Sequence, residues 1–275
     1  MTMSTLFTGI SELRTVSDAG TLNDAALVVT DGTISWVGPA DKAPAADDAV
    51  DLGGRAVLPG WVDSHTHMIF DGDRSAEFEA RMGGGTYQAG GIAVTMDATR
   101  SAGEERLEAL LIDRIAAAHK GGTTTLETKT GYGLNTESEI LAAQVASRHV
   151  DDVTFLGAHL VPPGAQAESY LDEVVGPMLD GVAPYVQWID VFCERGAFDE
   201  AQSRRVLAAG IERGLGVRVH GNQLGEGPGV ALAVEMGAAS VDHVNYLSDA
   251  DVEALASSNT VATMLPACDL STREP

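Results

Sequence analysis

The segment PGWVDSHTH at residues 59–67 indicates both a fold and a chemistry. It follows the apolar run that begins at Arg55, and it places His65 and His67 two positions apart. Side chains at this spacing on a strand point to the same side, so both imidazoles can bind one metal ion. Two surface histidines beside a turn are the alternative interpretation. The preceding strand and the PGxxD run favour the metal site.

From Val57 onward, short apolar or β-branched runs alternate with helical stretches. A strand followed by a crossover helix is the repeating unit of a parallel sheet. With the strand at Val57 there are seven such runs, the others being Thr123–Thr128, Val153–Leu156, Val186–Phe192, Leu215–Val219, Ser240–Asp242 and Val261–Leu265. A (β/α)8 barrel needs an eighth strand, whereas an open sheet is complete with seven, so the count alone leaves both architectures open.

The residues before Val57 have a different pattern, which is typical of a small β module. A β-prone run at Ala25–Thr30 is followed by Asp31-Gly32, a pair favoured in two-residue hairpin turns. We therefore expect two domains, a small β domain at residues 1–56 and a larger α/β domain at residues 57–275.

The composition is that of a globular protein with a strongly acidic surface. Lys and Arg number 17 and Asp and Glu number 40, which gives a formal net charge of −23. Such a surface repels phosphate backbones and anionic lipid head groups, which excludes nucleic acid and membrane surfaces as partners. Adaptation to high salt is one interpretation of the acidity, and a Lys-poor, Asp-rich proteome is the other.

We expect a cytoplasmic protein from the chain's apolar runs and cysteines. No apolar run approaches the length of about 18 residues that a membrane helix needs, and the N-terminus lacks the regions of a secretion signal. Cys193 and Cys268 lie far apart and lack CxxC spacing, so they are expected to be free thiols in a reducing compartment.

The remaining histidines divide into two groups. His159, His220 and His243 each follow directly on a predicted strand, where the functional site of a barrel lies. A single histidine at a strand end is often only a satisfied polar group. With the first-strand pair, however, five of the seven histidines occupy such positions. His119 and His149 lie on predicted helices and are expected at the surface.

The segment at residues 59–67 resembles the first-strand metal motif of the amidohydrolase superfamily. This resemblance implies an α/β fold, a (β/α)8 barrel with its metal at the carboxyl ends of the strands. It also implies a small β-sandwich, of which residues 1–56 would form the N-terminal portion. The metal ligands that it implies are His65, His67 and His220.

The same resemblance implies that His243 orients the water or the substrate, and that an Asp on the eighth strand is a further ligand. The chain ends at Pro275, after the seventh strand, so the barrel is expected to be truncated before the eighth. A binuclear centre would need a bridging Lys on the fourth strand. Trp188–Glu194 contains none, which favours a single metal ion. Glu194 itself is expected to form a salt bridge or a cap.

Several segments resemble the imidazolonepropionase family specifically. They are FDGDR at 70–74, EFEAR at 77–81, ETKTGYGL at 127–134, FLGAH at 155–159, DVFCE at 190–194, HGNQL at 220–224 and DH at 242–243. The resemblance implies a hydrolase of histidine degradation that uses zinc or iron. Its reaction would open the ring of 4-imidazolone-5-propanoate to give N-formimidoyl-L-glutamate. The resemblance also suggests a homodimer.

A small substrate with a flat ring and a carboxylate needs a cation and several hydrogen-bonding side chains. Arg74 suits the carboxylate, because a guanidinium can bind it through two hydrogen bonds. Tyr132 and, more weakly, Tyr87 could supply hydroxyl groups. His159 and Gln223 would form hydrogen bonds to ring or tail atoms.

The catalytic residues that the resemblance implies are His243 and Gln223. Ordinary structural roles are the alternatives for the substrate-binding residues, namely a salt bridge from Arg74 to Asp71 or Glu77, and simple packing for Tyr132. Two other functions also stay open. One is another cyclic-amide hydrolase or an aminohydrolase of the same superfamily, and the other is an inactive fragment that binds metal weakly.

Overall fold

The computed structural model describes residues 3–83 and 93–272 and divides the chain into two compact units, Met1–Trp61 and Val62–Pro275. Within the described ranges, no helix combines the length and the apolar character that crossing a membrane requires.

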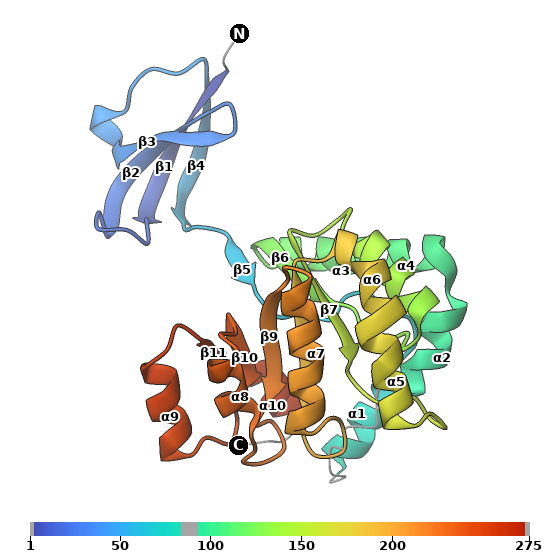
Figure 1. The fold of residues 1–275 in the computed structure, drawn as a ribbon. Coiled ribbons are helices and arrows are strands. Elements are labelled where there is room, and N and C mark those ends of the chain that lie inside the picture. The colour runs from blue at the N-terminus through green and yellow to red at the C-terminus, as the bar shows by residue number, and fades with distance from the viewer. Residues whose placement is uncertain (1–2, 84–92, 273–275) are drawn as a thin grey trace. The chain divides into compact units, whose positions relative to one another are not determined.

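The first unit is a four-stranded sheet in the order β3-β2-β1-β4 (Figure 1). Its elements are β1 (Ser4–Arg14), β2 (Thr21–Thr30), β3 (Thr33–Pro39), the 3-10 helix η1 (Ala40–Lys42) and β4 (Asp48–Val57). Strand β1 pairs antiparallel with β2 and parallel with β4. The predicted hairpin turn is confirmed, since Asp31 and Gly32 join β2 to β3 with φ values of 49° and 78°.

The strand expected at Val57 as the first of the barrel belongs instead to this small sheet. Val57 is the last residue of β4, where it pairs with Leu13 of β1. The first strand of the larger sheet is β5 (Trp61–Asp63). Pro59 lies between the two strands and ends the pairing, because a proline has no N–H for a ladder hydrogen bond.

The second unit contains a seven-stranded sheet in the order β11-β10-β9-β8-β7-β6-β5. After β5, its strands are β6 (Thr123–Lys129), β7 (Asp152–Ala158), β8 (Trp188–Cys193), β9 (Gly216–Gly221), β10 (Ser240–His243) and β11 (Val261–Thr263). Strands β6 to β11 pair in parallel with their neighbours. The predicted barrel sheet is confirmed, and β5 and β11 form the edges of its described part.

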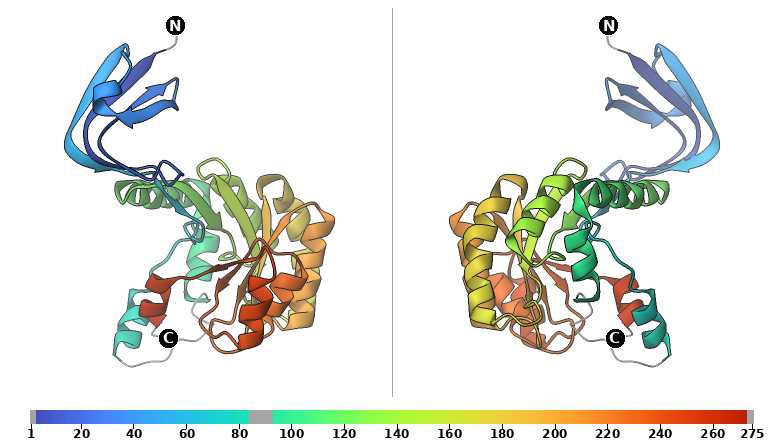
Figure 2. Two further views of the ribbon diagram at one scale, coloured as in Figure 1. Left: turned by 90° about the vertical axis from the view of Figure 1, so that its left-hand side faces the viewer. Right: turned by 90° about the vertical axis from the view of Figure 1, so that its right-hand side faces the viewer.

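Helices connect these strands, and most of them lie along one side of the curved sheet, whereas α1 (Ser75–Met82) and α10 (Pro266–Thr272) lie together apart from that layer (Figures 1 and 2). The other helical segments are α2 (Ala93–Ser101), α3 (Gly103–Lys120), α4 (Thr136–Ala146), α5 (Ala167–Glu173), η3 (Val174–Met178), α6 (Leu179–Val182), η4 (Ala183–Tyr185), α7 (Glu200–Glu212), α8 (Gly229–Glu235) and α9 (Asp249–Ala256). Strand–helix alternation of this kind places the carboxyl ends of all the strands at one end of the sheet.

The core of this unit lies between the central strands and their helices. Phe155 on β7 and Ile189 on β8 are fully buried, as are Leu171 on α5 and Leu207 on α7. Parallel strands are covered on both faces, which explains why their sequences read as apolar runs rather than as alternating ones. Any polar residue within such a run is therefore buried and needs a partner.

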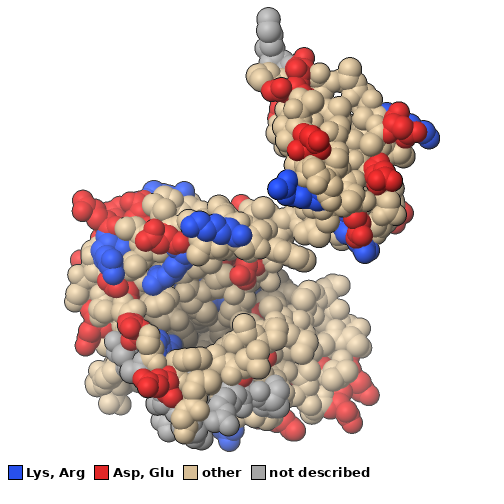
Figure 3. Space-filling view, turned by 180° about the vertical axis from the view of Figure 1, so that it is seen from behind, with Lys and Arg blue, Asp and Glu red and all other residues tan. Residues whose placement is uncertain are grey.

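Acidic side chains are spread over the visible face of each unit and do not gather in one patch (Figure 3). Several pair with arginines, as Arg204 on α7 does with Glu200 one turn away on the same helix and with Glu235 on α8. Exposed pairs of this kind each contribute little to stability. The formal charge of −23 is thus a property of the whole surface.

Candidate metal centre and active-site pocket

Four histidines from three strands converge at the carboxyl end of the sheet. His65 and His67 follow β5, His220 lies on β9 and His243 ends β10. The ring centroids of His65 and His220 are 4.7 Å apart, and those of His220 and His243 are 5.2 Å apart. Nε2 of His67 lies 3.4 Å from Nε2 of His220. Imidazole nitrogens this close to one another suit a shared cation.

The same histidines line a cavity of about 240 Å³. Its remaining walls are Thr66, Arg74, Tyr132, His159, Phe192, Gln223, Leu265 and Cys268. The structure therefore brings together every candidate site residue from the sequence except Tyr87, which lies outside the described residues. His119 and His149 are not part of this cavity.

Two buried carboxylates contact the outer nitrogens of histidines in the cluster. Asp242 Oδ2 forms a hydrogen bond of 2.7 Å with Nδ1 of His65. Asp190 Oδ2 is 3.0 Å from Nδ1 of His220, an ion-pair distance without the angles of a hydrogen bond. A carboxylate at Nδ1 fixes the tautomer and the orientation of the ring and leaves Nε2 to a metal. Sequence reasoning missed this role for both acids. The signal that could have revealed it is an acid within an apolar strand, as in the run from Ile189 to Phe192.

Lys129, at the end of β6, is fully buried beside these acids. Its Nζ lies 2.9 Å from Glu127 Oε1, 3.3 Å from Asp190 Oδ2 and 3.7 Å from Asp242 Oδ2. Burial opposes the charge, but the three carboxylates outweigh it and raise the pKa of Lys129 above its usual value. Lys129 is therefore an ammonium ion inside the sheet, another feature that sequence reasoning missed.

Four histidines of the pocket, His65, His67, His159 and His243, are neutral. Burial, with a smaller effect from the neighbouring His220, lowers the pKa values of His159 and His243 to about 3. Burial also lowers the pKa values of His65 and His67 well below their usual range. Metal binding requires neutral imidazoles, so burial favours it here.

The donor set fits a transition-metal ion. Ligand atoms of His65, His220 and His243 all lie within 4.8 Å of one another. Among the described residues, Oδ1 of Asp242 and Nδ1 of His67 are buried without a hydrogen-bond partner. Nitrogen-rich sites of this kind suit zinc or iron, whereas calcium and magnesium prefer oxygen.

A pH dependence of stability follows from the low pKa of His159. Between pH 6.5, about the pKa of an unfolded histidine, and pH 3, the unfolded state binds more protons than the folded state. The free energy of unfolding therefore falls as the pH falls through this window. A His159→Gln variant should show a shallower fall, by up to about 1.4 kcal/mol per pH unit. Denaturant titrations of the metal-free proteins between pH 7.5 and 5 would measure it, and equal slopes would contradict the assignment.

The loop between β6 and α4 carries Tyr132 into the pocket and is held by one buried carboxylate. Glu139 accepts hydrogen bonds from the backbone N–H groups of Gly131, Gly133 and Leu134, at 2.7, 2.8 and 2.9 Å. The spacing of Thr136 and Glu139 in the sequence predicts a capping box, and this prediction is wrong because the loop occupies the carboxylate. Asn135 caps α4 instead, through Ser138.

The loop also fixes His159. The carbonyl of Gly131 lies 3.0 Å from Nδ1 of His159, and the Tyr132 and His159 rings are 5.6 Å apart. Gly131 has a φ of 100°, and a Cβ there would lie 2.3 Å from the carbonyl oxygen of Leu156, so only glycine fits. The position of two pocket side chains therefore depends on the backbone that Glu139 holds.

A Glu139→Gln variant should weaken substrate binding more than turnover. The amide keeps one acceptor oxygen but turns its NH2 group toward a backbone N–H, which costs about 1–3 kcal/mol of stability. We expect KM to rise several-fold with a smaller change in kcat, measured by steady-state kinetics. Glu137→Gln on the exposed side of α4 is the control. A fall in kcat alone would contradict this interpretation of the loop.

Arg74 lies in the segment that follows His67 and reaches the cavity wall. Asp71, one of the acids considered as its partner, accepts hydrogen bonds from Arg106 at 3.0 and 3.3 Å. Tyr132, for which packing was the alternative, does stack on Phe70, with centroids 4.9 Å apart, but it also lines the cavity.

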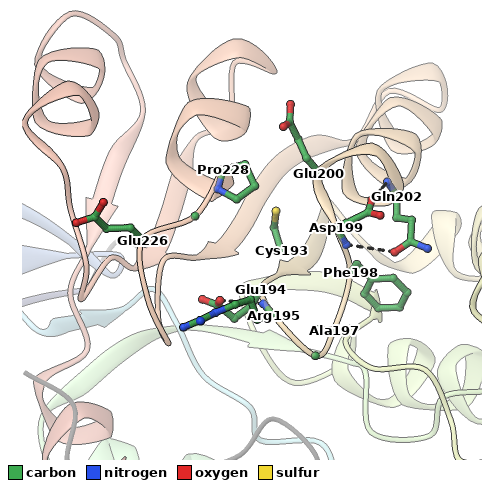
Figure 4. Close-up of a pocket in the computed structure, with 12 residues that line it drawn as sticks. Cys193, Glu194, Arg195, Ala197, Phe198, Asp199, Glu200, Gln202, Glu226 and Pro228 are labelled. Atoms are coloured by element: carbon green, nitrogen blue, oxygen red, sulfur yellow. Dashed lines mark hydrogen bonds between the residues drawn. The ribbon is translucent and has the colours of Figure 1, made fainter.

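A second cavity, of about 350 Å³, lies between the loops that follow β8 and β9 (Figure 4). Glu194 lines it and accepts hydrogen bonds from the backbone N–H groups of Arg195, Gln223 and Leu224. This differs from the salt bridge or cap expected for Glu194, because its carboxylate binds N–H groups of loop residues and Asp199 caps α7. The Glu194 carboxylate ties the two loops together and so holds Gln223 at the first cavity.

Comparison with known proteins identifies similar chains along almost the whole sequence. No family model matches the chain. The imidazolonepropionase of Saccharopolyspora erythraea is 66% identical over 273 residues, covering 99% of this chain and 70% of that protein. That of an Arthrobacter species is 64% identical, covering 99% and 71%, and that of Streptomyces coelicolor is 54% identical, covering 99% and 72%. The chain thus spans about 70% of the length of these relatives.

Solved structures with the same fold are more distant in sequence. A Xaa-Pro dipeptidase with bound methionine has a TM-score of 0.64 at 16% identity, covering 94% of this chain and 66% of that one. An atrazine chlorohydrolase from Arthrobacter aurescens, complexed with zinc, has a TM-score of 0.58 at 15% identity, covering 98% and 67%. At these identities the likeness concerns the fold alone, an amidohydrolase-type barrel.

Proposed function

The chain belongs to the imidazolonepropionase family, hydrolases of histidine degradation that act on a cyclic amide, and we propose that its histidine-lined cavity is where 4-imidazolone-5-propanoate is opened to N-formimidoyl-L-glutamate. The observation that carries this proposal is the set of side chains that line one cavity of about 240 Å³. It holds neutral histidines suited to a metal and, in the same wall, a guanidinium suited to the substrate's carboxylate.

We assign His65, His67 and His220 as ligands of a single zinc or iron ion. A bound ion of this kind supplies Lewis acidity, which polarises a carbonyl and activates water near neutral pH. The close approach of Nε2 of His67 and Nε2 of His220, at 3.4 Å, supports this ligand set. So does the contact of Asp242 and Asp190 with the opposite nitrogens of His65 and His220.

His243 is assigned the proton transfers of the reaction. Water adds to the ring carbonyl carbon, the bond from that carbon to the ring nitrogen breaks, and the nitrogen takes up a proton. His243 lines the cavity beside His65 and His220, so its ring is placed to accept the proton that water loses and to return it to the leaving nitrogen. Gln223 has no acidic proton, so its part is to orient the reacting groups through hydrogen bonds.

The other polar residues of the cavity are assigned to substrate binding. Arg74 binds the propanoate carboxylate, while Tyr132 and His159 form hydrogen bonds to ring or tail atoms. The Nδ1 contact of His159 with the Gly131 carbonyl leaves Nε2 for the substrate. Tyr87 keeps the same proposed role from the sequence.

The cellular setting is also a proposal. Cys193 and Cys268 are not joined in a disulfide, which suits the reducing cytoplasm. We propose a small molecule as the partner of the cavity, with neither nucleic acid nor membrane bound, and a homodimer on the strength of the family.

Another amidohydrolase activity, on a different cyclic amide or on a purine or pyrimidine, is the second candidate. The fold supports it, because the same barrel occurs in a dipeptidase and in an atrazine chlorohydrolase. Binding of metal without turnover is the third candidate. The guanidinium of Arg74 favours a substrate with a carboxylate over either.

The test is the loss of ultraviolet absorbance of 4-imidazolone-5-propanoate, with and without added zinc or iron. Protein from the longest reading frame that contains this chain would be used. We expect metal-dependent turnover with N-formimidoyl-L-glutamate as the product. Full turnover by chelated protein that contains no metal by elemental analysis would refute the mechanism. A folded, metal-loaded protein without turnover would shift the assignment to the second candidate.

A further inference from the structure

Lys129 is a fully buried cation that connects several strands of the barrel. It ends β6, and its Nζ lies within 3.7 Å of carboxylates from three positions, Glu127, Asp190 and Asp242. Asp190 comes from β8 and Asp242 from β10, so one ammonium group joins three strands. A buried ammonium is costly unless several partners compensate it, and here each partner is itself buried.

Two of these partners also contact the histidine cluster, through the same oxygens. Oδ2 of Asp190 lies 3.3 Å from Lys129 Nζ and 3.0 Å from Nδ1 of His220. Oδ2 of Asp242 lies 3.7 Å from Lys129 Nζ and 2.7 Å from Nδ1 of His65. Each carboxylate oxygen thus links the lysine to one histidine.

The two carboxylates would repel each other without the lysine. Oxygens of Asp190 and Asp242 lie within 4.8 Å of one another, in a region from which water is excluded. Like charges at such a distance in a buried site are strongly unfavourable. A cation in contact with both allows them to stay close and to keep their contacts with the rings.

We propose that Lys129 is a positioning residue for the metal site: it holds Asp190 and Asp242 so that His65 and His220 turn Nε2 toward the cavity. The inference rests on the proposed function for the identity of the ligands. Lys129 touches neither histidine and acts on both through the two acids. The third acid, Glu127, anchors the lysine. The hydroxyl group of Thr154 donates a hydrogen bond to Oε1 of Glu127 at 2.5 Å.

The test replaces the cation by an apolar side chain of similar length, Lys129→Met. We expect the dissociation constant for zinc, measured by chelator competition, to rise about tenfold or more, as when outer partners of metal-binding histidines are removed. In the metal-free variant, nitrogen-15 spectra of the histidine rings should show His65 and His220 changing from one tautomer to a mixture. The tautomer of His159, held by a backbone carbonyl, should not change.

A core variant controls for general loss of stability. Leu171→Ala on α5 removes a fully buried side chain in the same unit and should lower the melting temperature without changing zinc affinity or tautomers. If Lys129→Met does not fold, Lys129→Gln supplies the measurement, because an uncharged amide can bond to one carboxylate but cannot neutralise two.

Wild-type zinc affinity and unchanged tautomers in a folded Lys129 variant would overturn the proposal and leave the lysine a purely structural role. The ring spectra are taken on metal-free protein and need no turnover. They therefore decide on Lys129 even if the wild-type protein fails to open the imidazolone ring.

Discussion

A His220→Ala variant is expected to lose its metal ion and at least roughly a thousandfold in kcat/KM. His220 lies between the other histidines, with its ring 4.7 Å from that of His65 and 5.2 Å from that of His243. Its removal also leaves the buried carboxylate of Asp190 without its histidine contact. Metal catalysis supplies several kcal/mol of barrier lowering, and each 1.36 kcal/mol corresponds to a factor of ten.

Metal content by elemental analysis and steady-state kinetics would measure this loss. His149→Ala is the matched control, because His149 lies outside the cavity and pairs with Glu108 at 2.6 Å. That variant should retain both metal and activity. If His220→Ala purified with a full complement of metal and normal turnover, the ligand assignment would be wrong.

An Arg74→Ala variant is expected to lose roughly a hundredfold in kcat/KM toward the carboxylate-bearing imidazolone. The estimate corresponds to two charge-assisted hydrogen bonds of about 1.5 kcal/mol each. The loss should be much smaller with a substrate analogue that has a methyl ester in place of the carboxylate. Arg74→Lys should recover only part of the activity, because an ammonium lacks the paired donors of a guanidinium.

Arg106→Ala is the control for this experiment, since Arg106 is exposed and pairs with Asp71 outside the cavity. Kinetics on the acid and on the ester would be compared for all three variants. Equal losses on both substrates would mean that Arg74 does not bind the carboxylate. If the Arg74 variants kept the wild-type kcat/KM on both the acid and the ester, an amidohydrolase with another substrate would be favoured.

The sequence by itself determined the parallel strands and the positions of most site residues. Central strands buried on both faces are mostly apolar or β-branched, so runs such as Val153–Leu156 are visible without any structure. The carboxyl ends of parallel strands meet at one end of the sheet. Histidines that directly follow such runs, as His159 and His220 do, can therefore be assigned to one site before their distances are known.

The boundary between the two units needed the structure. The residues on either side of Pro59, those up to Val57 and those of β5, are both extended. Only strand pairing shows that Val57 belongs to β4, because it pairs with Leu13 of β1. Pairing partners so far apart in sequence leave no local pattern.

The tertiary structure alone decided what supports the site. Lys129, Asp190 and Asp242 come from three strands, and their charges are balanced only when those strands lie side by side. Glu139 likewise looked like part of a helix cap, because its loop partners become its neighbours only after folding. A sequence displays apolar burial through local periodicity, whereas a buried charge depends on partners that the chain brings together from a distance.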